Sequence, residues 1–109
     1  MYVPQRSDII WLDFTPQKGH EQAGRRPALV LSPHQYNRKT GLALCCPITS
    51  RIKNYPFEVL LPTNITVTGV VLADQMKSLD WQKRNATFIT QLDVAVTKHV
   101  AQKLQTLIV

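Results

Sequence analysis

The chain has 109 residues, of which 13 are Lys or Arg and 7 are Asp or Glu, so its formal net charge is +6. This length fits a single domain over residues 1–109, and the 44% apolar and 18% charged fractions are typical of a folded globular chain. No apolar run approaches the roughly 18 residues that a membrane-spanning helix needs, and the first residues lack the apolar segment of a secretory signal. We therefore expect neither a membrane association nor secretion.

The basic charge is concentrated in one third of the chain. Residues 18–53 hold seven basic side chains and one acidic one, whereas the rest of the chain holds six of each. A basic excess confined to one region favours an anionic partner. The alternative is a set of solvated loops that are basic only by composition.

The cysteines and histidines give no sign of a disulfide framework or a metal site. Cys45 and Cys46 are adjacent, so in a strand they point to opposite faces and are poorly placed to bond to each other. This usage fits the reducing cytoplasm. His20, His34 and His99 are scattered and no CxxC or HExxH spacing occurs, so we expect no metal and no other cofactor, unless a site is assembled in three dimensions.

The predicted elements are short apolar strands separated by turn residues, followed by one helix. The strands cover residues 8–14, 27–32, 42–48, 57–61 and 69–73, with a further one around 86–89. A short helical turn is expected over 34–40, before Gly41. Strands at this spacing indicate a small barrel or sandwich.

The C-terminal segment has the pattern of an amphipathic helix. Residues 90–93 resemble a capping box in which Asp93 replaces the usual Glu. Apolar residues then recur at helical spacing: Val96, Val100, Leu104, Leu107 and Ile108. We expect this stripe to pack on the sheet, and a partner-binding stripe is the alternative.

Two groups of polar residues lie beside the predicted strands. The first is a Gly-flanked loop that holds His20, Glu21, Arg25 and Arg26. Guanidinium groups bind phosphate bidentately, and Arg26 is the stronger candidate because Pro27 fixes it at the start of a strand, while Arg25 is expected in the softer loop. The structural alternative is an arginine that covers a barrel end.

The second group follows the third and fifth predicted strands. Thr49 and Ser50 come directly after the third strand, and their hydroxyls can bind phosphate oxygens, although such pairs are more often turn residues. Asp74 directly follows the fifth strand, where a carboxylate is a turn residue, a structural acceptor or a base.

An ordered set of segments resembles the MazF/PemK family of bacterial toxins from toxin–antitoxin modules, most closely its MazF branch. The matching segments are residues 8–14, 19–24, 26–32, 36–37, 39–41, 47–49, 55–59 and 71–75. The resemblance implies a mainly β (α+β) fold: a small SH3-like β-barrel with short helices and a C-terminal helix. It also implies a homodimer that cuts single-stranded RNA, mainly messenger RNA, at short sequences without a metal. A cognate MazE-like antitoxin would neutralise the toxin by laying an acidic C-terminal segment over the RNA-binding surface.

The resemblance also implies site residues. In the MazF branch the arginine before the strand proline and the threonine after the third strand carry the site, and these positions are Arg26 and Thr49. Metal-free cleavage can use the 2′-OH of the RNA, leaving a 2′,3′-cyclic phosphate and a 5′-OH, with Glu21 as a candidate general base. The predicted substrate-binding residues are His20, Arg25, Ser50, Arg51, Lys53, Tyr55, Phe57, Asp74 and Gln75.

The PemK branch uses a histidine, an arginine and an aspartate instead. His20 and Asp74 match its first and third positions, but Leu72 stands where its arginine would be, so the Arg26/Thr49 arrangement is favoured. Two other classes remain open: a nucleic-acid-binding SH3-like barrel without catalysis, and a CcdB-like toxin that acts on DNA gyrase. Neither of them requires both Arg26 and Thr49.

Overall fold

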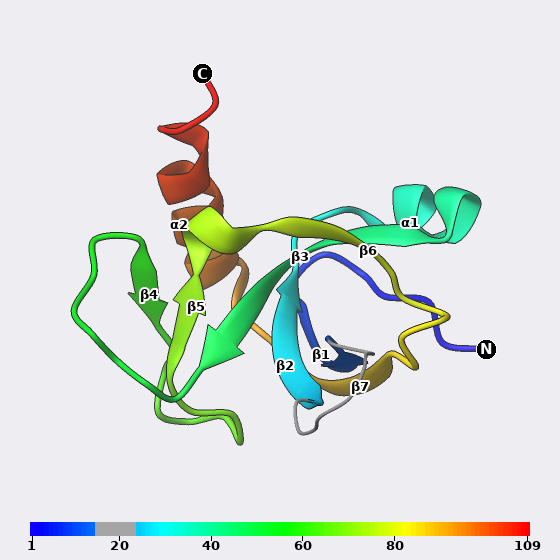
Figure 1. Ribbon diagram of the computed structural model, residues 1–109, viewed down its shortest axis with the longest axis horizontal. Coiled ribbons are helices and arrows are strands. Elements are labelled where there is room, and N and C mark those ends of the chain that lie inside the picture. The colour runs from blue at the N-terminus through cyan, green and yellow to red at the C-terminus, as the bar shows by residue number, and fades with distance from the viewer. Residues whose placement is uncertain (15–23) are drawn as a thin grey trace.

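The elements of the protein follow the alternation of turns and apolar runs in the sequence. The computed structural model describes residues 1–14 and 24–109 (Figure 1). The strands are β1 (Asp8–Asp13), β2 (Arg25–Val30), β3 (Leu42–Thr49), β4 (Glu58–Leu60), β5 (Val70–Leu72), β6 (Lys77–Asp80) and β7 (Thr87–Gln91). The helices are α1 (His34–Thr40) and α2 (Val94–Gln105), and a 3₁₀ turn, η1 (Ala73–Gln75), joins β5 to β6.

These strands form one antiparallel sheet in the order β4-β5-β3-β2-β1-β7, and β6 pairs with the first half of β3. In Figure 1, β4 and β5 lie on one side of β3, and β2, β1 and β7 lie on the other. Among the described residues no pairing joins β4 to β7, so the sheet does not close into a complete barrel. The expected α+β class is confirmed, and β6 is a strand that the sequence pattern did not predict.

The central strands are buried on both faces, which explains why they read as continuous apolar runs. Ile9, Leu29 and Cys46 belong to one core cluster, while Ile10 and Cys45 belong to a second cluster on the opposite face. Both cysteines are free thiols, as expected, and burial raises the pKa of each to about 12. They are therefore apolar core residues at neutral pH.

Helix α2 begins later than the sequence pattern predicts. Thr90 is part of β7, and the N-cap is Asp93, whose carboxylate accepts a hydrogen bond from the Ala95 N–H at 2.9 Å. The predicted capping box is therefore wrong, because the polar residue expected at the third helical position is itself the cap.

The apolar stripe of α2 packs on the first core cluster only in part. Val100 is fully buried there and Val96 packs against it, as expected. Leu107 and Ile108 follow the last residue of the helix and are 52% and 70% exposed. None of the helices in the described ranges has the length and apolar character needed to cross a membrane.

Candidate active site

A groove of about 630 Å³ opens where β2 and β3 separate. The pairing of these strands ends at Ala28 and Pro47, and a proline has no N–H with which to extend the ladder. Beyond that point β3 turns away and pairs with β5, where Thr49 lies opposite Val70. The first residues of β2 and the last residues of β3 thus form facing walls of one groove.

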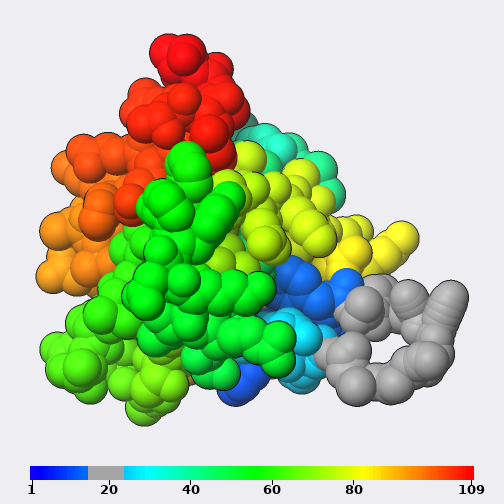
Figure 2. All heavy atoms as spheres, turned by 60° about the vertical axis from the view of Figure 1, so that its left-hand side comes forward, coloured from blue at the N-terminus to red at the C-terminus, as the bar shows by residue number. Residues whose placement is uncertain are grey.

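Arg26 and Thr49 lie on these two walls. Arg26 is an exposed residue of β2, and Thr49 is the half-buried last residue of β3. In Figure 2 the cyan beginning of β2 and the green segment that follows β3 meet on one face of the molecule. The groove therefore brings together the guanidinium and the hydroxyl that the sequence singled out.

The hydroxyl of Thr49 is oriented by its own turn. Its Oγ1 accepts a hydrogen bond from the Arg51 N–H at 3.1 Å, and among the described residues its hydrogen has no acceptor. Gly69 holds the neighbouring backbone very close: a Cβ there would lie 2.1 Å from the Thr49 carbonyl oxygen, and its φ is +119°. Thr49 is thus held at the groove with a hydroxyl hydrogen that no described group accepts.

A tyrosine and a carboxylate pair on the same wall. The Tyr55 hydroxyl donates to Asp74 Oδ2 at 2.7 Å, and this bond raises the pKa of Tyr55 above its ordinary value. The other carboxylate oxygen, Oδ1, is buried with no partner among the described residues. The Tyr55 ring also lies 5.9 Å from that of Phe57, at 50°. The pair therefore presents the exposed ring of Tyr55, while the unused acceptor of Asp74 is shielded from solvent.

Cations outnumber carboxylates among the described residues of the groove. The charged groups are Arg26, Arg51, Lys53, Lys77, Glu58 and Asp74. Glu58 has a structural task, because its Oε2 accepts a hydrogen bond from the Lys53 N–H at 3.0 Å. Helix α2 supports the same loop through Lys103, whose Nζ donates to the Pro56 carbonyl at 2.6 Å. The net positive groove suits an anionic ligand.

Only some of the other predicted site residues lie in the groove. Gln75 lines the groove with the residues named above, whereas Ser50, Phe57 and Arg25 do not. Phe57 packs against the first core cluster instead. Arg25 is the first residue of β2 rather than part of a loop, which corrects the sequence-based expectation.

Two predicted site residues, His20 and Glu21, lie outside the described residues.

Six lining residues were missed as site residues by the sequence analysis: Phe14, Pro47, Ile48, Glu58, Leu72 and Lys77. Lys77 pairs with Cys45 across β3 and β6. Residues 77–80 contain one apolar residue, Leu79, which is also the only buried one, so this strand showed no alternating pattern. Phe14 and Leu72 carry no polar group, so nothing in their residue type points to a site.

Comparisons with known proteins identify relatives of this chain. A family model described as PemK-like, MazF-like toxin of type II toxin-antitoxin system matches residues 5–108. The endoribonuclease toxin MazF of Escherichia coli K12 is 58% identical over 86 residues, which cover 79% of this chain and 77% of that protein. The endoribonuclease PemK of Escherichia coli is 33% identical, covering 97% of this chain and 86% of that protein.

Solved structures give the same result. MazF from Deinococcus radiodurans superposes with a TM-score of 0.90 at 55% identity, covering 98% of this chain and 97% of that one. A MazE-MazF structure from the same organism gives a TM-score of 0.88 at 50% identity, covering 98% and 96%. The chain therefore belongs to the family of PemK-like, MazF-like toxins of type II toxin–antitoxin systems.

Proposed function

We propose that this protein is the endoribonuclease toxin of its module and cleaves single-stranded RNA, mainly messenger RNA, without a metal ion. The observation that carries the proposal is the presence of Arg26 and Thr49 on facing walls of one cationic groove. Relatives at 58% and 33% identity bear the name endoribonuclease. A guanidinium and a hydroxyl donor are the groups that can bind a phosphate and stabilise charge that develops on it.

The proposed reaction uses the ribose 2′-OH, the group that distinguishes RNA from DNA. A base removes the 2′-OH proton, the 2′ oxygen attacks the phosphorus, and the P–O5′ bond breaks as the 5′ oxygen takes up a proton. The products are a 2′,3′-cyclic phosphate and a 5′-OH. No water is consumed, so atoms and charge balance within the RNA and the two proton-transfer groups.

Arg26 stabilises the negative charge of the phosphorane, because a guanidinium stays protonated and is a poor general acid at neutral pH. Thr49 donates its hydroxyl hydrogen to a phosphate oxygen, an assignment that agrees with the bond its Oγ1 accepts from Arg51 N–H. Glu21 is the proposed base, and His20 is the proposed acid or a phosphate contact.

The arrangement favours the MazF branch over the PemK branch. Leu72 lines the groove. It stands where the resemblance to the PemK branch would place an arginine, and a leucine supplies neither a proton nor a phosphate contact. Asp74 would then serve in base recognition, together with Gln75 and Tyr55. Unstacked RNA bases are read by aromatic stacking and by hydrogen bonds to their edges, and these three residues offer both.

The proposed partners follow from charge and from the structural neighbours. A solved neighbour at 50% identity is a MazE-MazF structure, and we propose that a cognate MazE-like antitoxin covers the groove with an acidic C-terminal segment. Such a segment would pair with Arg26, Arg51, Lys53 and Lys77, where RNA phosphates otherwise bind. The toxin would act in the cytoplasm as a homodimer, which doubles the basic charge available to RNA.

The test is incubation of the purified protein with single-stranded RNA in EDTA, followed by mapping of the cut ends. We expect cuts that leave a 5′-OH and a 2′,3′-cyclic phosphate. Intact RNA would contradict the enzymatic function and favour a binding barrel or a gyrase poison, and 5′-phosphate ends would contradict the mechanism.

The matched variants are Arg26→Ala and Arg38→Ala, which remove the same charge from the groove and from exposed helix α1. We expect Arg26→Ala to lower the cleavage rate at least about 100-fold with the fold intact, and Arg38→Ala to cut normally. Equal rates for the two variants would remove Arg26 from the site.

A further inference from the structure

The end of the β1–β2 hairpin that carries Arg26 has limited support from the hydrophobic core, because in the described part of the hairpin beyond Leu12 only the partly buried Phe14 packs against the second core cluster. Leu12, opposite Arg26 in the ladder, is the last residue of β1 that is buried in the second core cluster. The next pair, Asp13 and Arg25, is solvent-exposed, and so is Arg26 itself. Apart from Phe14 and the strand pairing, the position of Arg26 in the groove depends on polar contacts.

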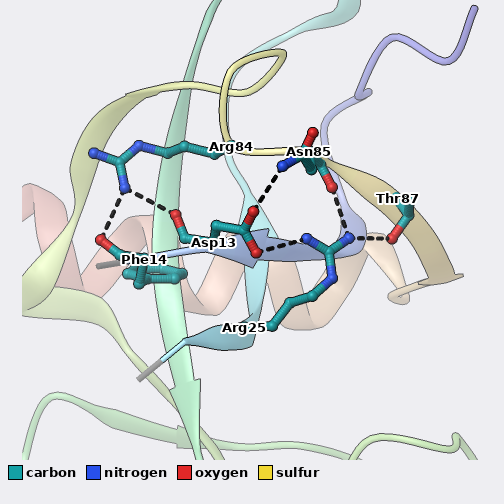
Figure 3. Close-up of polar contacts among 6 residues, drawn as sticks. All are labelled: Asp13, Phe14, Arg25, Arg84, Asn85 and Thr87. Carbon is teal, nitrogen blue, oxygen red and sulfur yellow. Dashed lines mark hydrogen bonds and ion pairs between the residues drawn. The ribbon is translucent and has the colours of Figure 1, made fainter. Parts of the chain in front are cut away.

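A network of polar contacts closes this end of the hairpin (Figure 3). The Asp13 carboxylate accepts hydrogen bonds from Arg25 Nη1 at 2.9 Å and from Asn85 Nδ2 at 2.8 Å. Arg25 Nη2 donates to the Asn85 carbonyl at 2.6 Å and to Thr87 Oγ1 at 2.9 Å. Both terminal nitrogens of Arg25 therefore donate to groups of the protein itself, which accounts for its absence from the groove.

Arg84 reaches the same place from the turn between β6 and β7. Its Nη1 donates to the Asp13 carbonyl at 2.9 Å and to the Phe14 carbonyl at 2.8 Å, as Figure 3 shows. The Asp13 N–H in turn donates to the Arg84 carbonyl at 3.0 Å. Asn85 has a left-handed φ of 55°, a conformation that Asn tolerates better than most residues. The turn is thus shaped to face the hairpin.

We propose that the Arg84–Asn85 turn is a positioning clamp that sets Phe14 and Arg26 in the groove. The clamp consists of Asp13, Arg25, Arg84 and Asn85. None of the four lines the groove, so they act through Phe14, whose carbonyl Arg84 holds, and through Arg26, the residue next to Arg25. The proposal rests on the proposed RNA cleavage, because it assigns these residues to the alignment of that same groove.

The Asp13–Arg25 pair of the clamp is exposed and the contacts of Arg84 are only part-buried, so the clamp adds modestly to global stability. Misplacement of a charged group by about 1 Å, in contrast, costs up to about 100-fold in rate. We therefore expect Arg84→Ala to lower kcat about 10- to 100-fold. Its affinity for a non-cleavable, 2′-deoxy-substituted strand should stay within about threefold, and its Tm within about 3 °C. Arg84→Lys should restore most of the rate, since one ammonium can donate to both carbonyls.

The matched control is Lys83→Ala, which removes an exposed cation from the same turn without touching the network. It should cut RNA like the wild type. The clamp proposal is overturned if Arg84→Ala keeps the wild-type kcat, or if its loss of rate matches a loss of folded protein. A wild type that leaves RNA intact would instead contradict the proposed function.

A second readout tests the clamp without any catalysis. The NMR resonances of the Phe14 ring and the Arg26 side chain should shift or broaden in Arg84→Ala and stay unchanged in Lys83→Ala. Unchanged resonances in Arg84→Ala would overturn the clamp whether or not the wild type cuts RNA.

Discussion

The wall of the groove that carries Thr49 is built on the buried core, whereas the wall that carries Arg26 ends in an exposed polar network. Thr49 follows buried Ile48, and Gly69 packs directly on its backbone. Arg26 stands beside the exposed ion pair of Arg25 with Asp13. Two residues proposed to act on one phosphate are thus positioned by different interactions, Thr49 by core packing and Arg26 beside a polar network. Mutations can therefore disturb one wall without the other.

The largest effect is expected at Gly69. An alanine there keeps an unfavourable φ of +119° and places its Cβ 2.1 Å from the Thr49 carbonyl oxygen, so β3 and β5 must move apart. We expect Gly69→Ala to lower the free energy of unfolding by about 2–3 kcal/mol and to reduce cleavage with it. Urea unfolding followed by circular dichroism measures the change.

Gly41 supplies the matched control, because its φ is +73° but nothing lies within 4 Å of an added Cβ. Gly41→Ala therefore carries backbone strain without the contact, and we expect a loss of about 1 kcal/mol with normal cleavage. Equal stabilities of the two variants would show that the close approach to Thr49 is unimportant.

The smallest effect on stability is expected on the wall that carries Arg26, where Asp13 titrates at acidic pH. Hydrogen bonds from Asn85 and then Arg25 hold the pKa of Asp13 below its ordinary value of 3.8. A carboxylate whose pKa is lower in the folded state stabilises the fold above about pH 3.8, and this contribution is lost as the pH falls through the folded value. Because Asp13 is exposed, the contribution is under about 1 kcal/mol.

Comparison of the wild type with Asp13→Asn by urea unfolding at several pH values isolates this contribution. The wild type should be the more stable protein from about pH 5 upward, and the difference should shrink below pH 3.8. A stability difference that does not change with pH would contradict the charge-based account of this wall.

Much of the core-built wall could be predicted from the sequence. Contiguous apolar runs marked the strands buried on both faces, and hydroxyl and carboxyl groups directly after two of them, Thr49 and Asp74, pointed to the groove. These features could be read locally because strand ends and turns depend on residues that are neighbours in the sequence.

The exposed wall could not be predicted in the same way. The contacts of Arg25 with Asn85 and Thr87 span 60 and 62 residues along the chain, so no local pattern links them. Arg25 was predicted to bind the substrate from its residue type alone, whereas in the fold its guanidinium pairs with Asp13. Strand β6 was missed for a related reason, because only Leu79 is buried within it.

The central claim is that the groove cleaves RNA through the substrate's own 2′-OH. The most direct measurement uses an RNA oligonucleotide with one mapped cleavage site, and a second strand that carries a single 2′-deoxyribose directly upstream of that site. The account predicts normal cleavage of the first strand in EDTA and none of the second, with similar binding of both. Cleavage of the deoxy-substituted strand at the normal rate would contradict it.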